Sequence, residues 1–251
     1  MPNNLTSQIR AAASITEAEH AALFALFRRH YDAATSGAFA RDLAAKDDVI
    51  LLTDRASGAL AGFSTQVVER YSVSGDPVRV LFSGDTIIDP AHWGEQELVR
   101  SWCRYAGAAL ASAESAGEPL YWLLISKGYR TYLYLPLFFR YYFPSRAPTP
   151  DLRRTASEIA RQRFGDPFCT RTGCLKFARS CGHLHGTLAE VPEKRRSDPH
   201  VRLFLERNPG FASGDELVCL APITAENMRS FAARHLRYGM LDAQLQCATP
   251  C

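Results

Sequence analysis

The sequence of 251 residues has little net charge, because 29 lysines and arginines are balanced by 26 aspartates and glutamates, a formal surplus of +3. So small a surplus argues against the strongly basic surface that binds nucleic acid or an anionic membrane. The densest basic run, Lys194–Arg196, is interpreted as a solvated loop between Glu193 and Asp198. We therefore expect neither nucleic acid nor a membrane among the partners.

Long apolar runs are also absent. The longest apolar and aromatic stretch, Tyr132–Phe139, contains Pro136 and is far shorter than the about 20 residues that span a bilayer. Residues Met1–Leu5 lack the basic region and apolar core of a signal peptide. The cysteines number seven, an odd count that favours reduced thiols over a disulfide framework. We expect a cytoplasmic protein.

Familiar catalytic motifs are missing as well: the sequence has no serine-centred elbow, Walker loop, dinucleotide fingerprint or His-Glu-x-x-His pattern. One cluster of metal-binding residue types is present, with the spacing C-x4-C-x6-C-x-H-x-H. It lacks the close cysteine pair of common zinc sites, so an irregular loop with free thiols is favoured and no metal is expected. The role of this cluster stays open; its members are Cys169, Cys174, Cys181, His183 and His185.

What is present is an alternation of predicted strands and helices. Thr16–Glu19 has the pattern of a capping box that opens a helix, and a long helix is expected after Gly94. Gly84 and Asp85 interrupt a strand, where a glycine often marks a bulge. Strands are predicted over residues 9–12, 49–52, 60–71, 78–88 and 120–125. This order favours an α/β fold with a mixed sheet.

Beyond Pro144 the regular alternation of predicted strands and helices ends. A helix is predicted over 152–164, irregular chain over 165–200, a strand over 216–220 and a helix over 224–235 with Thr224 as its N-cap. We therefore divide the chain into a core, residues 1–145, and a C-terminal extension, residues 146–251. The extension is expected to complete the fold or the substrate site.

Two segments resemble the GNAT superfamily of N-acyltransferases. Gly58–Phe63 is similar to a frequent hairpin of that family, and Thr86–Gly94 resembles the segment that leads from a strand into the helix that receives coenzyme A. The resemblance covers roughly residues 9–143. It implies a GNAT-like, mostly antiparallel mixed sheet flanked by helices, and transfer of an acyl group from a thioester to the amine of a small molecule.

The helix start departs from the family pattern Arg/Gln-x-x-Gly-x-Gly/Ala. Gln96 and Leu98 occupy the places of two small residues, and Glu95 and Glu97 add carboxylates. At about 5 Å and an effective dielectric near 20, each carboxylate would repel a diphosphate by about 3 kcal/mol. This repulsion favours a donor without the nucleotide diphosphate, an acyl-phosphopantetheine on an acyl carrier protein, as used by the distantly similar acyl-homoserine-lactone and N-acyl amino acid synthases. Acyl-CoA is the other expected donor. The alternative is a catalytically silent GNAT-like binding protein.

Three residues are candidates for the base that deprotonates the amine. Asp85 lies among apolar residues, where burial raises the pKa of a carboxyl group. Glu69 lies on the second hairpin strand, with pairing to a neighbouring arginine as its structural alternative. His92 precedes the long helix, where capping or packing is the alternative. For Asp85 the structural alternative is a hydrogen bond into the strand bulge. The catalytic and the structural interpretation stay open for all three residues.

The segment after the last core strand contains three tyrosines and two cations. The resemblance implies a tyrosine here that protonates the leaving thiolate, and Tyr129, Tyr132 and Tyr134 are all near that place. Lys127 and Arg130 are candidates to bind a phosphate or a substrate carboxylate.

The resemblance also places the donor against the end of the third hairpin strand and the turn that follows, with these residues: Ile87, Ile88, Trp93 and Gly94. The aromatic segment Leu135–Phe143 covers the sheet, lines an acyl pocket or forms the face of a homodimer. If the protein is an enzyme, we expect four side chains to converge on one cleft: Asp85, Lys127, Tyr129 and Tyr132.

Overall fold

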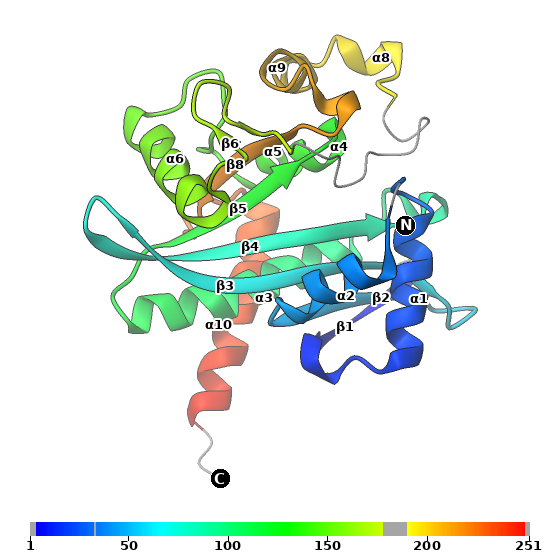
Figure 1. Ribbon diagram of the computed structural model, residues 1–251. Helices are drawn as coiled ribbons and strands as arrows, with labels where there is room; N and C mark the ends of the chain where they lie inside the picture. Colours follow the sequence, from blue (N-terminus) through cyan, green and yellow to red (C-terminus); the bar gives the residue numbers. More distant parts are fainter. Residues whose placement is uncertain (1–3, 33, 178–189, 249–251) are drawn as a thin grey trace.

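The computed structural model describes residues 4–32, 34–177 and 190–248. These residues form an α/β fold around one eight-stranded sheet with the strand order β1-β2-β3-β4-β5-β8-β7-β6 (Figure 1). The strands are β1 (Leu5–Ala11), β2 (Asp48–Asp54), β3 (Leu60–Val73), β4 (Asp76–Ile88), β5 (Leu120–Ser126), β6 (Phe168–Cys169), β7 (Cys174–Leu175) and β8 (Glu216–Pro222).

Helices cover both faces of this sheet. They are α1 (Glu17–Arg28), α2 (Ser36–Ala44), α3 (Glu97–Ser115), α4 (Tyr129–Tyr132), α5 (Tyr134–Phe138), α6 (Pro150–Phe164), α8 (Glu193–Arg196), α9 (Pro199–Arg207) and α10 (Ser230–Ala248). Helices α1 and α2 pack around Phe63 and Ile87, and α6 packs on the same face around Val80 and Phe82. Helices α3 and α10 lie together behind the sheet (Figure 1), where Leu81 points.

The pairing of the strands confirms the predicted fold class. The parallel pair is β4–β5, joined by the crossover helix α3, while the other described neighbours in the sheet are antiparallel. The sheet is therefore mixed and mostly antiparallel, with helices on both sides, as the resemblance implied.

The predicted bulge lies in β4. Ser64 and Gln66 of β3 pair with Thr86 and Ser83, so Gly84 and Asp85 together face a single residue of β3. Glycine is needed here because a Cβ on Gly84 would lie 2.5 Å from the hydroxyl oxygen of Thr65. The bulge ends the regular part of β4 just before the cleft described below.

The capping box at the start of α1 is confirmed. The hydroxyl of Thr16 accepts a hydrogen bond from the backbone N–H of Glu19, and the Glu19 carboxylate accepts one from the Thr16 N–H. These two bonds satisfy N–H groups that a helix start otherwise leaves open.

The predicted start of the last helix is wrong. Thr224 does accept a hydrogen bond, from the N–H of Asn227, but it closes a turn, and α10 begins at Ser230. The reason is that Met228 and Arg229 pair with the backbone of Phe139 and Phe138, which holds them out of a helix.

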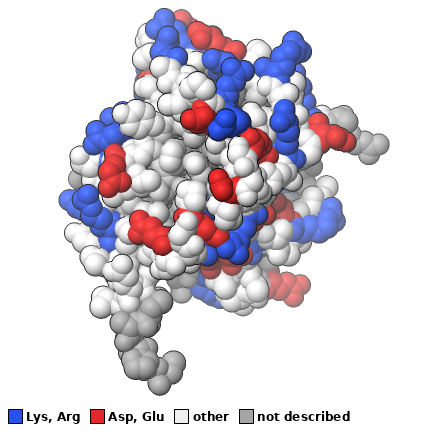
Figure 2. Space-filling view, turned by 90° about the vertical axis from the view of Figure 1, so that its left-hand side faces the viewer, with Lys and Arg blue, Asp and Glu red and all other residues white. Residues whose placement is uncertain are grey.

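Strand β8 brings the C-terminal part of the chain into the same sheet as the first part. It pairs with β5 along the whole length of that strand, from Tyr121↔Pro222 to Ser126↔Leu217. Positive and negative side chains are interspersed over the face shown in Figure 2, without a broad region of one sign. Within the described ranges, the helices are all too short or too polar to cross a membrane.

Candidate functional site

A cleft opens where β4 and β5 separate. The two strands pair from Arg79↔Leu120 to Ser83↔Leu124, but β4 continues to Ile88. A cleft of about 610 Å³ lies beside this last part of β4. Six of the residues predicted for the site line it: Ile87, Ile88, Trp93, Gly94, Tyr129 and Arg130.

The cleft is lined from both sides of the sheet. Gln96 and Val99 contribute from the start of α3, whereas His30 and Tyr31 contribute from the residues after α1, which packs on the opposite face. The walls of the cleft are therefore formed by elements that pack on opposite faces of the sheet.

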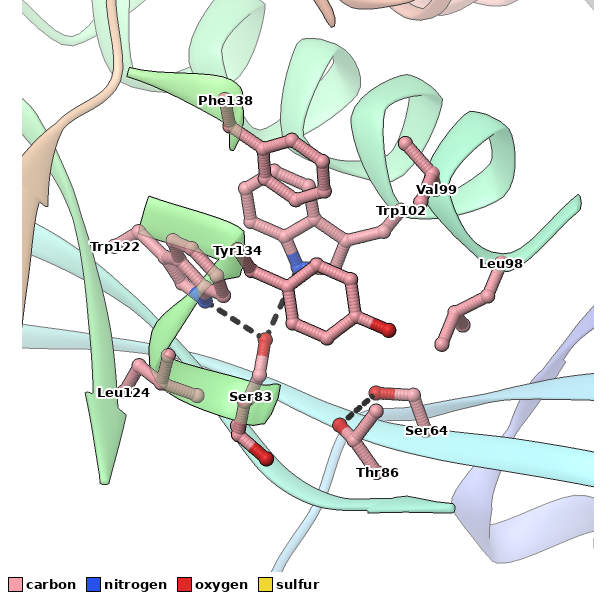
Figure 3. Close-up of a pocket in the computed structure, with 11 residues that line it drawn as sticks. Ser64, Ser83, Thr86, Leu98, Val99, Trp102, Trp122, Leu124, Tyr134 and Phe138 are labelled. Atoms are coloured by element: carbon pink, nitrogen blue, oxygen red, sulfur yellow. Dashed lines mark hydrogen bonds between the residues drawn. The ribbon is translucent and has the colours of Figure 1, made fainter. Parts of the chain in front are cut away.

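A chain of buried hydrogen bonds forms the floor next to this cleft, and Figure 3 shows the bonds at its two ends, those of Ser83 with the tryptophans and that between Ser64 and Thr86. The hydroxyl of Ser83 accepts from the indole N–H of Trp102 at 3.0 Å and of Trp122 at 2.9 Å, and it donates to Gln66 at 2.7 Å. Gln66 donates to Ser64, whose hydroxyl lies 2.7 Å from that of Thr86. The chain fixes the end of β4 against α3 and β5.

A small apolar cavity of about 20 Å³ lies above this floor. Phe138 stacks on Trp102 with ring centroids 5.2 Å apart and forms one wall. Tyr134 lines this cavity and the larger cleft, and in Figure 3 its phenol oxygen points to the side of Ser64 and Thr86. Burial raises the pKa of Tyr134, so its hydroxyl stays protonated.

The turn between β4 and α3 closes over the cleft through an aromatic and cationic stack. The guanidinium of Arg130 lies 4.6 Å from the ring centroid of Trp93 and 4.9 Å from that of Tyr129. The indole N–H of Trp93 donates to the carbonyl of Ile88 at 3.0 Å. Gly94 adopts φ +99°, which other residues rarely tolerate, so the glycine makes this turn possible.

The carboxylates at the start of α3 are engaged with β1 and the residue before it. Glu97 accepts a hydrogen bond from Ser7 at 2.6 Å, and Glu95 accepts one from Asn4 at 3.0 Å. Glu95 still lines the cleft, whereas Glu97 does not. The N-cap residue Gln96 makes no side-chain capping bond to the first turn of the helix.

Asp85 belongs to a partly buried group of charges, and neither it nor Lys127 is among the residues that line the cleft. Burial raises the pKa of its carboxyl from the ordinary 3.8 to about 7, and the negative charges of Asp42 and Glu216 act in the same direction. Lys127, which opposes this rise, is 3.2 Å from Glu216, and its ammonium lies 5.2 Å from the ring centroid of Tyr31. A pKa near 7 lets this carboxyl group change its charge close to neutral pH.

The four residues expected to converge do so only in part. Asp85 and Lys127 share the charged group, and Tyr129 lines the cleft. Tyr132 is fully buried, and its hydroxyl donates to the carbonyl of Pro144 at 2.8 Å. That geometry gives Tyr132 a packing role away from the cleft.

Glu69 and His92 also lie outside the cleft. Glu69 pairs with Arg163 and accepts from the hydroxyl of Tyr71 at 2.8 Å. Because Glu69 is opposite Val80, six residues before Thr86, it is roughly 20 Å from the cleft along the sheet. His92 turns toward Asp54, with 4.0 Å between its Nε2 and the carboxylate.

Several residues of the cleft were missed by the sequence analysis. His30 and Tyr31 carried no motif, and only the fold brings them to the end of β4. Arg195, part of the run interpreted as a solvated loop, belongs to α8 and lines the cleft from the C-terminal part of the chain.

The cysteine and histidine cluster is only partly described. Cys169 and Cys174 face each other across the β6–β7 pair and are free thiols. Cys181, His183 and His185 lie outside the described residues. No three histidine, cysteine or acidic side chains gather as a metal site in the described ranges.

Comparison with known proteins leaves the activity open. No family model and no curated protein matches the sequence. Similar solved structures include a probable N-acyltransferase from Enterococcus faecalis (12% identity, TM-score 0.38, 55% of this chain and 33% of that one). Others are a GNAT family N-acetyltransferase from Escherichia coli in complex with CoA (16%, 0.34, 51% and 66%) and an acetyltransferase from Trypanosoma brucei (18%, 0.37, 59% and 99%).

These neighbours bear the names of acyltransferases. The chain spans only one third of the length of the Enterococcus protein. Identities below 20% and TM-scores below 0.4 do not transfer an activity. The function has to be argued from the residues of the cleft.

Proposed function

We propose that the protein transfers an acyl group from a thioester to the amine of a small molecule. The observation that supports this most is the cleft at the separated ends of β4 and β5, which is lined from both faces of the sheet. A donor and an acceptor can meet there without competing for the same entrance.

We assign the donor to the side of α3 and α4. The thioester arm would lie along Thr86–Ile88, under the stack of Trp93 and Arg130. A phosphate of the donor would be held by the cleft cations Arg130 and Arg195, because guanidinium groups match phosphate geometry. Acyl-CoA and acyl carrier protein share this arm, so both donors fit the assignment.

The transfer step uses one base and one acid. The amine nitrogen attacks the carbonyl carbon, an N–C bond forms, and the C–S bond breaks. The proton of the nitrogen passes to Asp85, whose raised pKa of about 7 suits a base near neutral pH. Tyr134 gives its proton to the leaving thiolate.

The test combines binding and turnover. The protein is heated with acetyl-CoA, a long-chain acyl-CoA, free pantetheine or a loaded acyl carrier protein, and thiol release is then followed with a panel of primary amines. A ligand at 100 times its dissociation constant adds about 2.7 kcal/mol of stability, a shift of a few degrees. Arg195→Ala should lose donor binding, whereas the neighbouring Arg196→Ala, paired with Glu193, should keep it.

The silent binding protein remains the second candidate, because Gln96 and Leu98 replace the small residues of the family pattern. Stabilisation by a thioester without thiol release in the presence of any amine would favour this candidate. If none of the four ligands stabilises the protein, the proposed transferase is contradicted.

A further inference from the structure

His30 has an unusual position in the wall of the cleft. It follows α1, is 7% exposed and lines the side of the cleft opposite α3. Its Nδ1 lies 3.0 Å from the carbonyl oxygen of Leu26. Because a carbonyl oxygen only accepts, Nδ1 carries the proton, and Nε2 of the neutral ring is left as an acceptor.

That acceptor is buried and has no hydrogen-bond partner among the described residues. Buried polar atoms are nearly always paired, so an unpaired one in the wall of a cleft calls for a ligand or an ordered water. The backbone bond to Leu26 holds the ring, so Nε2 is a fixed acceptor rather than one that rotates freely.

The surrounding charges favour a hydrogen-bond donor that carries a positive charge. Lys127 is paired with Glu216, and Lys46 is paired with Asp42 at 2.7 Å. Asp85 makes no ion pair or side-chain hydrogen bond in the described structure, and its charge acts on Tyr31, the residue next to His30. The two ion pairs balance, so Asp85 in its ionised form leaves one negative charge in excess in this group, whose Lys127 ammonium lies over the ring of Tyr31.

We propose that His30 Nε2 accepts a hydrogen bond from the N–H of a primary amine that binds in the cleft. His30 thereby selects acceptors that carry an N–H and orients the nitrogen toward the thioester. This assignment rests on the proposed function only in calling the amine an acyl acceptor; the binding site itself needs no donor.

The test uses binding alone and so is independent of acyl transfer. The probes are benzylammonium and benzyltrimethylammonium, which share charge and ring, but the second has no N–H. Long-range 1H–15N spectra of the full chain at pH 8, with His30 identified by its loss in His30→Leu, should show the Nδ1–H tautomer. Benzylammonium should move the Nε2 resonance, and the quaternary probe should leave it in place.

Matched variants give the second readout. His30→Leu removes the acceptor and should weaken benzylammonium binding about tenfold, with little change for the quaternary probe. His30→Gln, whose amide oxygen lies near the place of Nε2, should restore most of the affinity. An Nε2–H tautomer, or equal shifts with both probes, would overturn the assignment even if the protein proves to be an acyltransferase. Failure to release thiol with an intact benzylammonium site would instead contradict the proposed transfer.

Discussion

Asp85 sets the expected pH dependence of the transfer. Burial raises the pKa of its carboxyl to about 7, so the carboxylate form, the one that accepts a proton, becomes dominant as the pH rises above 7. We expect the rate to increase between pH 6 and pH 8. Asp85→Asn cannot accept the proton and should lower kcat by about 100-fold or more. The measurement is the pH–rate profile with the amine that gives the fastest thiol release.

The amine substrate also titrates, so its protonation changes the rate as well. Comparison of the wild-type protein with Asp85→Asn separates the titration of the amine from that of Asp85. The ratio of the wild-type rate to the Asp85→Asn rate cancels the contribution of the free amine. This ratio should rise through pH 7 and then level off. A ratio that does not change with pH would show that another group is the base. Asp76→Asn, at the exposed start of β4, is the matched control and should behave as wild type.

Ser83 is a single hydroxyl that serves three buried partners. Ser83→Ala leaves the indole N–H groups of Trp102 and Trp122 and the amide oxygen of Gln66 without this partner. Since an unsatisfied buried group costs about 1–3 kcal/mol, we expect the free energy of unfolding to fall by about 2–4 kcal/mol. Urea denaturation measures it.

Two further variants test the origin of that loss. Ser115→Ala removes an exposed hydroxyl from α3 and should change stability by less than about 0.5 kcal/mol. Trp122→Phe removes one of the two indole donors, so Ser83→Ala should cost less in that background. Additive effects of the two substitutions would mean that the serine and the tryptophan do not share a bond of any value.

At the scale of elements, the turn between β4 and α3 is expected to govern donor affinity. Trp93→Ala removes the ring that lies 4.6 Å from Arg130, a contact worth about 0.5–1 kcal/mol at an exposed site. We expect KM for the thioester to rise about two- to fivefold, with stability nearly unchanged. Trp93→Phe keeps a ring and should stay near wild type; an equal loss would assign the effect to the bond with Ile88.

Local signals made most elements predictable. The capping box at Thr16 and the bulge at Gly84 depend on residues close in sequence, and both were predicted correctly. Thr224 was a cap signal too, but pairing of Met228 with Phe139 moved the helix start to Ser230. Local chemistry therefore fixes an element only where no distant segment competes for the same backbone groups.

The site was less predictable because it is assembled from distant segments. The bond from Trp122 to Ser83 and the approach of Arg195 to the cleft join parts of the chain that share no motif. The raised pKa of Asp85 was predicted because its apolar neighbours in sequence indicate desolvation, while its role as a base stays a prediction. Tyr132 was misleading, since its helical turn directs it into the core beside Pro144.

At the scale of the whole molecule, the C-terminal part packs on the crossover helix α3 through helix α10. Helix α10 crosses α3 where two glycines allow close contact of the backbones. A Cβ on Gly107 would lie 2.0 Å from the carbonyl oxygen of Leu236, and one on Gly239 would lie 1.9 Å from that of Arg104. Because α3 also carries Trp102 to the floor of the cleft, α10 supports the site from outside. The boundary near residue 145 stays a prediction.

Gly239→Ala tests this contact, because two effects of opposite sign compete. Replacing glycine by alanine inside a helix stabilises it by about 1 kcal/mol when space is free. Here the new methyl group would overlap the backbone of α3, and overpacking of this kind costs about 1–3 kcal/mol or more. We expect the cost of the steric overlap to exceed the gain in helix propensity, which lowers the urea midpoint and reduces turnover. Gly37→Ala in α2 meets only Arg41 at 3.6 Å and should be neutral or stabilising. If both variants are stabilised alike, α10 does not pack closely on α3, and the C-terminal part cannot support the cleft in this way.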